Sequence, residues 1–154
     1  MRRLTLQLAA LFLALPLLLA ARPVRAEIID IDHATLNQLR QKGIPVIDIR
    51  LQSEWEQTGI VPGSHLLTFF DERGRYDAPA WLAKVHKIAK PNEAVIVICR
   101  TGNRTRPVSQ LLSQQAGYTT VYNVKSGIKD WIAQGGAPAP AAPVIAACKA
   151  EQRC

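Results

Sequence analysis

The chain has 154 residues, 48% of them apolar and 20% charged, and a formal net charge of +7. Four of its 19 lysines and arginines lie in residues 1–26, so the remaining 128 residues carry 15 basic against 12 acidic side chains, a net charge of +3. This length suits one domain with one core, and the small net charge, without any Lys/Arg-rich run, argues against binding to nucleic acid.

The first 26 residues have the pattern of a signal peptide. Two arginines precede an uncharged apolar run, residues 8–21, which Pro16 interrupts. The run is shorter than the roughly 20 apolar residues that span a membrane, and residues 24–26 resemble a cleavage site. We therefore expect cleavage after Ala26, export to the periplasm or out of the cell, and no stable membrane insertion after cleavage. An uncleaved membrane anchor is the alternative.

Strand-like and helix-like segments alternate through the next part of the chain. Apolar and β-branched residues predict strands at 27–31, 44–49, 65–67, 93–99 and 119–124. Helical patterns predict helices at 33–42, 53–56, 78–89, 106–117 and 126–136. Asp32 fits the N-cap of the first helix, and Ser53 with Glu56 fits a capping box for the second. This alternation indicates an α/β fold with a mainly parallel sheet.

The composition changes after Gly136. The sequence "APAPAAP" (137–143) is typical of a Pro/Ala linker that is extended and unpacked. It leads into a terminal segment that contains Cys148 and Cys154. We therefore divide the chain into a signal peptide (1–26), one domain (27–136), and a linker with a cysteine-containing tail (137–154).

Cys99 carries the strongest chemical signal, because it ends the most apolar predicted strand. Ligands of an open parallel sheet bind outside the carboxyl ends of its strands. Residues 99–104, Cys-Arg-Thr-Gly-Asn-Arg, would form a loop there before a helix that begins near Thr105. Gly102 and Asn103 tolerate the positive φ angles of a tight loop, and inward N–H groups with nearby arginines favour a thiolate. We interpret Cys99 as a nucleophile; an inert buried cysteine is the alternative.

Several segments, in the right order, resemble the rhodanese family of sulfurtransferases. They are "VIDIRLQSEW" (46–55), "GIVPGSH" (59–65), "CRTGNR" with the threonine after it (99–105), and "VYNVKSGIKDW" (121–131). The family often has Gly-Gly where this chain has Ser126-Gly127. The resemblance covers residues 27–138 and implies a five-stranded parallel sheet with helices on both faces. It also implies that Cys99 carries a persulfide and that no metal or organic cofactor is needed.

The resemblance implies roles for the residues around Cys99. The substrate-binding cradle corresponds to Arg100, Thr101, Gly102, Asn103 and Arg104, and the positions of structural support correspond to Asp48, Arg50 and Glu54. The thiolate would take the outer sulfur of an anionic donor such as thiosulfate and pass it to a thiol or to cyanide. The expected partners are these small molecules, with an exported protein as an alternative.

Two alternative functions stay open. Cysteine phosphatases and arsenate reductases also place a thiolate in an anion cradle, but the phosphatase pattern C-x5-R would require an arginine where this chain has Thr105. Arg104 comes one residue early, and a loop this short closes around sulfur more readily than around a tetrahedral oxyanion. A sulfur carrier or partner-binding module with little turnover would use the same residues as a sulfurtransferase.

The remaining cysteines and histidines suggest less. In an oxidising compartment Cys148 and Cys154 most simply pair with each other, and this pairing predicts a non-helical tail because six helical residues span ~9 Å. A tail cysteine could instead resolve a Cys99 persulfide or trap Cys99 in a disulfide. The chain has three histidines, whose spacing does not indicate a metal site.

Overall fold

The structure of the chain is a computed structural model that describes residues 26–152. The predicted signal peptide, apart from Ala26, and Cys154 lie outside the described residues. Within this range no helix has both the length and the apolar character that crossing a membrane requires.

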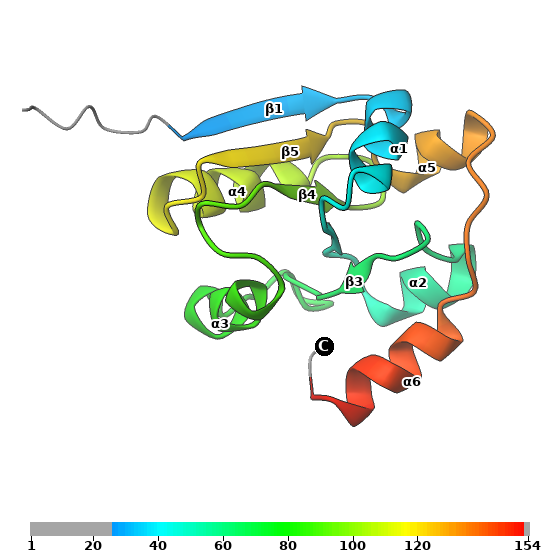
Figure 1. Cartoon of the computed structure of the whole chain (residues 1–154). Coiled ribbons are helices and arrows are strands. Elements are labelled where there is room, and N and C mark those ends of the chain that lie inside the picture. The colour runs from blue at the N-terminus through cyan, green and yellow to red at the C-terminus, as the bar shows by residue number, and fades with distance from the viewer. Residues whose placement is uncertain (1–25, 153–154) are drawn as a thin grey trace, which may run out of the picture.

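Within residues 26–152, five strands form a single sheet in which every neighbouring pair is parallel. They are β1 (Glu27–Ile31), β2 (Val46–Asp48), β3 (His65–Leu66), β4 (Val95–Ile98) and β5 (Thr120–Val124). Their order across the sheet is β1-β5-β4-β2-β3, which runs from top to bottom in Figure 1. The predicted α/β fold with a five-stranded parallel sheet is confirmed. The most apolar strand, β4, occupies the centre, and all four of its residues are buried.

In the described part of the chain, six α-helices connect the strands and follow the last one. They are α1 (His33–Gln41), α2 (Gln52–Thr58), α3 (Ala78–Ile88), α4 (Thr105–Gln110), α5 (Gly127–Ala133) and α6 (Ala142–Ala150). α4 continues without interruption into a π-helical turn, η1 (Leu111–Gln115).

One predicted helix cap is confirmed and one is wrong. The Asp32 carboxylate accepts a hydrogen bond from the Thr35 N–H at 2.8 Å, as expected for the N-cap of α1. The expected capping box of Ser53 and Glu56 does not form, because α2 begins earlier and its third residue is Glu54. The Glu54 carboxylate therefore accepts the hydrogen bond from the Leu51 N–H, at 3.0 Å.

Helices cover both faces of the sheet, and three apolar clusters hold the layers together. Trp81 and Val85 of α3 pack with Val97 and Val121 on one face. On the other face the buried cluster contains Leu36, Ile96, Ile98 and Trp131. A third, smaller cluster lies beside β3 and consists of Trp55, Ile60, Leu66, Ala141 and Ile145. Burying each large apolar side chain contributes about 1.5–3 kcal/mol before entropy is subtracted.

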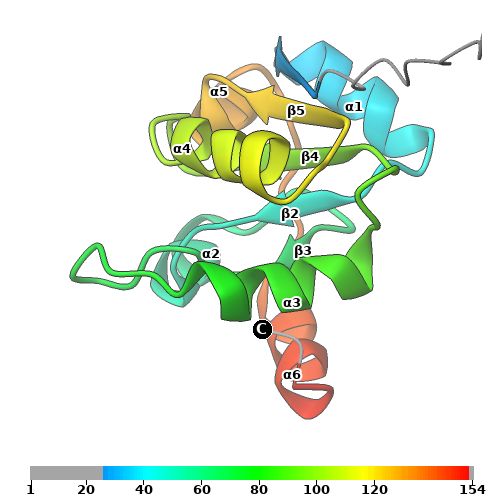
Figure 2. The same ribbon diagram turned by 90° about the vertical axis from the view of Figure 1, so that its left-hand side faces the viewer.

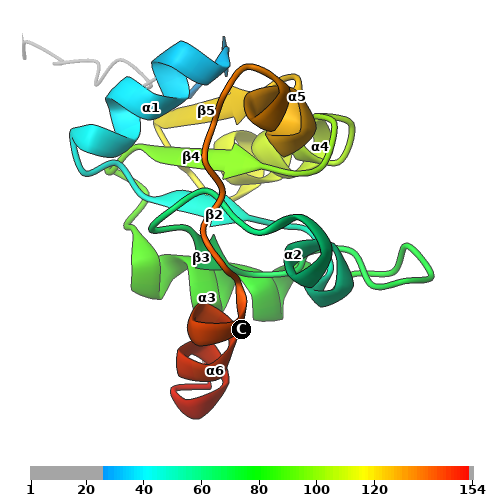
Figure 3. The ribbon, with the colours of Figure 1, turned by 90° about the vertical axis from the view of Figure 1, so that its right-hand side faces the viewer.

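The segment after Gly136 packs against the domain, so the expectation of an unpacked linker is wrong. In Figure 3 this segment descends from α5 to α6. Ala139 and Ile60 form an antiparallel bridge, with N–H···O distances of 2.9 and 3.0 Å. α6 then lies beside the edge strand β3 (Figure 2). The apolar residues of α6 complete the third cluster and cover the edge of the sheet at β3. Covering an edge strand in this way explains why the segment packs against the domain.

The two cysteines among the described residues lie in different parts of the fold. Cys99 is a free thiol, so it is not trapped in a disulfide with a tail cysteine in this structure. The predicted pairing of Cys148 with Cys154 involves a residue outside the described range. Cys148 lies on α6, not on the non-helical segment that this pairing led us to expect, but α6 ends at Ala150. The spacing of a continuous helix therefore does not apply between the two cysteines.

Candidate active site

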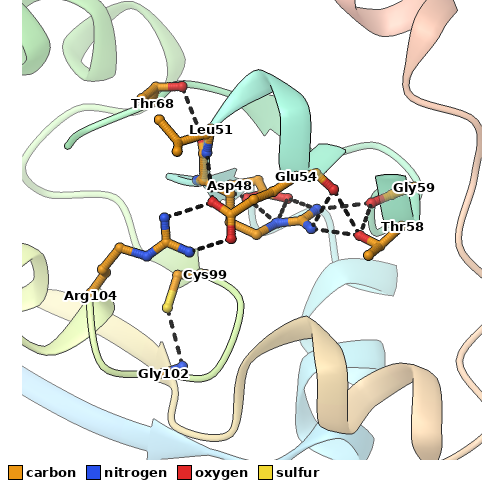
Figure 4. A network of polar contacts seen from close by, with 10 residues as sticks. Asp48, Leu51, Glu54, Thr58, Gly59, Thr68, Cys99, Gly102 and Arg104 are labelled. Carbon is orange, nitrogen blue, oxygen red and sulfur yellow. Dashed lines mark hydrogen bonds and ion pairs between the residues drawn. The ribbon is translucent and has the colours of Figure 1, made fainter. Parts of the chain in front are cut away.

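Cys99 follows β4 directly and begins the loop that leads into α4. Its side chain is fully buried, and its Sγ accepts a hydrogen bond from the Gly102 N–H at 3.2 Å (Figure 4). Arg100, Thr101 and Asn103 are exposed on the outer side of this loop. The chain thus curls around the sulfur and directs a backbone donor at it. Such a donor stabilises negative charge on the sulfur.

Gly102 allows the loop to approach the end of β5. Its φ angle is +88°, and a Cβ at this position would overlap the carbonyl oxygen of Lys125. Only glycine avoids both the backbone strain and this overlap. The Thr105 hydroxyl donates a hydrogen bond to the Gly102 carbonyl at 2.7 Å and so fixes the loop against the first turn of α4.

The start of α5 holds the other side of the loop. The Ile128 N–H donates to the Cys99 carbonyl at 2.9 Å, and the Lys129 N–H donates to the Arg100 carbonyl at 3.1 Å. Gly127 permits this approach, since a Cβ there would overlap the Arg100 carbonyl oxygen. Ser126 has a φ angle of −101°, which any residue can adopt. The departure from the Gly-Gly pattern therefore falls at the position where a side chain is tolerated.

Arg104 forms a two-armed ion pair with Glu54. Its two terminal nitrogens donate to the two carboxylate oxygens at 2.7 and 2.6 Å, which joins the Cys99 loop to α2 (Figure 4). Burial raises the pKa of Glu54, but hydrogen bonds from Arg104 and from the Leu51 N–H outweigh it and lower that pKa below its ordinary value. The hydrogen bond to Glu54 raises the pKa of Arg104, and the neighbouring Cys99 adds to the rise.

Asp48 and Arg50 form a second ion pair, which is fully buried, next to the Glu54–Arg104 pair. The Arg50 guanidinium donates to the Asp48 carboxylate at 2.7–3.1 Å. It also donates to the Thr58 hydroxyl at 2.7 Å and to the Gly59 carbonyl at 2.9 Å. These bonds satisfy the buried charges and secure the carboxyl end of α2 to β2. Asp48, Arg50 and Glu54 contact other groups of the protein, and their role as structural support stays a prediction.

The structure brings the predicted site residues together around one sulfur atom but gives them different surroundings. Arg104, predicted to bind substrate, already has a carboxylate partner, whereas Arg100 is exposed. Sequence reasoning did not identify Lys125, Gly127 or Thr105 as part of the loop's framework. The contacts of Lys125 and Gly127 join segments that are distant along the chain, and the family pattern gave a signal at Gly127 and at Thr105. Among residues 26–152, no group of three or more metal-ligating side chains could hold a metal ion.

Residues 32–134 match the family described as Rhodanese-like domain. Two known proteins are similar to the chain. It is 28% identical over 122 residues to Protein HIGH ARSENIC CONTENT 1, mitochondrial, of Arabidopsis thaliana, covering 77% of this chain and 71% of that protein. It is 30% identical over 95 residues to Rhodanese domain-containing protein CG4456 of Drosophila melanogaster, covering 59% of this chain and 84% of that protein.

The fold also matches solved structures. A rhodanese-related protein from Thermoplasma volcanium superposes with a TM-score of 0.52 at 26% identity, covering 71% of this chain and 95% of that one. The similarity therefore extends over nearly all of a protein of comparable fold.

Proposed function

Because the chain belongs to the rhodanese-like domain family, we propose that it is a sulfurtransferase that works through a persulfide on Cys99. The observation that carries this proposal is the placement of Cys99. A free thiol lies at the carboxyl end of the central strand, with the Gly102 N–H directed at its sulfur. A thiolate and a persulfide anion both gain from such a donor.

The reaction has two displacement steps. The Cys99 thiolate attacks the outer sulfur of a donor such as thiosulfate, a new S–S bond forms, and sulfite leaves with the electron pair of the broken bond. The outer sulfur of the Cys99 persulfide is then attacked by a nucleophilic acceptor, a thiol or cyanide, and the Cys99 thiolate is regenerated. No net oxidation or reduction of the protein occurs over the cycle.

The burial of Cys99 restricts the substrates of this reaction. Its side chain has 0% exposure, so a donor must present a narrow terminal sulfur and the loop must open locally to admit it. Thiosulfate has such a terminal sulfur, whereas a bulky disulfide does not. We therefore expect small anionic donors to react faster with Cys99 than large ones.

Intact-mass measurement after incubation with thiosulfate tests the proposal. The wild-type chain should gain one sulfur atom, and Cys99→Ser should gain none. Addition of cyanide should then remove the sulfur as thiocyanate. Failure of the wild type to gain sulfur would refute the proposed reaction. A persulfide that forms but passes to no small acceptor would instead favour a carrier or partner-binding module with little turnover.

Oxyanion reduction is a second candidate, because one relative bears the name HIGH ARSENIC CONTENT 1. Arg104 does not favour it, since the guanidinium expected to bind a tetrahedral oxyanion is paired with Glu54. Arsenate reduction with a thiol reductant, measured for the wild type and for Cys99→Ser, separates the two reactions. Turnover of arsenate that depends on Cys99 would favour this second candidate.

We also propose that the protein is exported, on the pattern of residues 1–26. Export would place its sulfur donor and any protein partner outside the cytoplasm. The mass of the chain recovered from the exporting cell should correspond to a protein that begins at Glu27.

A further inference from the structure

The edge strand β1 leaves backbone hydrogen-bonding groups without partners. It is the outermost strand of the sheet, and no strand lies beyond it in the described part of the chain (Figure 1). Its two ends bond inward, through the Glu27 N–H at 2.9 Å and the Ile31 carbonyl at 3.4 Å. Because alternate residues of an edge strand face its neighbour, Ile28 and Asp30 direct their N–H and carbonyl groups away from β5.

The side chains along this edge are also uncovered on the face that carries α4. Ile28 is 37% exposed and is, with Tyr76, one of the two exposed large apolar side chains among residues 26–152. It lines a cavity of about 250 Å³ between β1 and α4. The other residues that line this cavity are Asp30, Arg106, Gln110 and Asn123.

Two opposite charges in this cavity are not paired with each other. The Asp30 carboxylate accepts a hydrogen bond from the Asn123 side-chain amide at 2.7 Å. Arg106 forms no ion pair with any residue from 26 to 152, and both charged side chains are exposed. The edge therefore presents one positive and one negative group to a strand that might approach it.

A second copy of β1 matches both the backbone groups and the charges of this edge. In an antiparallel pair related by a two-fold axis at Ile29, Ile28 of each copy faces Asp30 of the other. Each facing pair exchanges two hydrogen bonds, so every outward N–H and carbonyl group of the two strands is used. Each Asp30 then lies beside Ile28 of the partner subunit, and the cavity that this side chain lines contains the partner's Arg106.

We infer that β1 is an interface through which two copies of this chain associate, with their sheets joined across a two-fold axis. The pair covers the exposed Ile28 and places opposite charges next to each other. It also closes on itself, since neither copy keeps a free β1 edge. β1 has only five residues, so the interface is small and the association is weak.

Sedimentation equilibrium of the full chain measures this association. The average mass should rise from one chain toward two as the protein concentration increases through the micromolar range. Ile28→Pro removes an outward N–H but no bond to β5, and it should weaken the association by about tenfold or more. Ile28→Ala keeps the N–H and should weaken it less. Tyr76→Ala removes the other exposed large apolar side chain and should leave it unchanged. Urea denaturation shows whether Ile28→Pro is folded.

A cysteine at the two-fold axis tests the register without depending on the proline variant. In the inferred pair the two Ile29 residues face each other with Cα atoms about 4.5 Å apart, within the reach of a disulfide. With diamide as the oxidant, Ile29→Cys should therefore form a disulfide between two chains, whereas Lys149→Cys on α6 should not. Peptide mass mapping identifies the linked positions. Arg106→Met should weaken the association by about threefold, the effect of an exposed ion pair.

The outcomes decide the inference without reference to sulfur transfer by Cys99. The mass of a single chain at every concentration would overturn it, even if another protein bound along β1. An association that Ile28→Pro leaves unchanged would place the contact on another surface and would also overturn it. An associating Ile29→Cys chain that forms no linkage between chains would refute the two-fold register.

Discussion

Gly102 and Gly127 fix the backbone around Cys99, because a side chain at either position would overlap a carbonyl group of the neighbouring segment. Both residues combine a positive φ angle with a close approach to the backbone of another segment. A positive φ angle is common in turns. The close approach of the two backbones, by contrast, holds the Cys99 loop against the end of β5 and the start of α5. The absence of side chains at Gly102 and Gly127 therefore positions the Cys99 sulfur as much as the polar groups of the loop do.

Gly102→Ala should separate the two effects when it is compared with Gly43→Ala. Gly43 has a similar φ angle of +84° but has no atom within 4 Å of an added Cβ. The control should cost about 1 kcal/mol of unfolding free energy, from backbone strain alone. Gly102→Ala adds the overlap with Lys125 and should cost on the order of 3 kcal/mol. Urea denaturation measures both.

Sulfur loading gives this comparison a functional readout. Gly102→Ala should also slow the gain of sulfur from thiosulfate, because the donor N–H moves away from Sγ, and Gly43→Ala should not. Equal stability and equal loading in the two variants would contradict the steric role of Gly102.

At the scale of elements, α2 is the support on which the Cys99 loop rests. The Arg50 guanidinium secures α2 to β2 through Asp48 and Gly59. Glu54, on the same helix, then binds Arg104 of the loop. A buried pair with satisfied hydrogen bonds thus supports a partly exposed pair above it. The chain uses arginine at both points, since a planar guanidinium can bind two oxygens at once.

The Glu54–Arg104 pair makes a pH-dependent contribution to stability. The pKa of Glu54 is lower in the folded protein than its ordinary value, because hydrogen bonds from Arg104 and Leu51 outweigh burial. The contribution is therefore fully present above the unfolded pKa of about 4.3 and is lost as the pH falls through the lower folded value. Between pH 5 and 8 it should be constant.

Glu54→Gln isolates this contribution. At pH 7 the variant should be less stable than the wild type by about 1.5–3 kcal/mol, the range for hydrogen bonds to charged groups. Denaturation curves from pH 7 down to pH 3 should show the difference shrinking below about pH 4. Glu56→Gln, an exposed neighbour on α2, is the control and should show no such trend. A difference that stays constant down to pH 3 would exclude the carboxylate as its source.

At the scale of the whole molecule, the features that could be predicted from the sequence are those that depend on local periodicity. Alternating apolar and helical segments were sufficient for the α/β class and for each strand of the sheet. The order of the strands was not readable from spacing, because hydrogen bonding between strands depends on segments far apart. Within the site, a strand ending in a cysteine and followed by Gly102 was enough to locate the loop.

What the sequence could not predict were the contacts between distant segments. Arg104 and Glu54 are 50 residues apart, and either could equally have faced solvent. The same limitation produced the error after Gly136, where alanine and proline are typical of an unpacked linker. These small residues pack beside Ile60 and Trp55 only because β3 is short and leaves an apolar edge uncovered.

α6 therefore belongs to the folded unit, and we expect it to support the Cys99 site through α2. Ile145 of α6 is buried in the same cluster as Trp55, which follows Glu54 on α2. Ile145→Ala should lower the unfolding free energy by about 2–4 kcal/mol, since it leaves a cavity in a small cluster. The exposed Lys149→Ala on the same helix should lie within about 0.5 kcal/mol of the wild type.

The same variant should loosen the support of the loop, so Cys99 should react faster with a small alkylating reagent in Ile145→Ala than in Lys149→Ala. Urea denaturation and timed alkylation followed by mass analysis measure the two effects. A tail that merely lies on the surface would give equal midpoints and equal alkylation rates for the two variants. A loss of stability without faster alkylation would instead confine the role of α6 to covering β3, and would show that α2 keeps Glu54 in place without it.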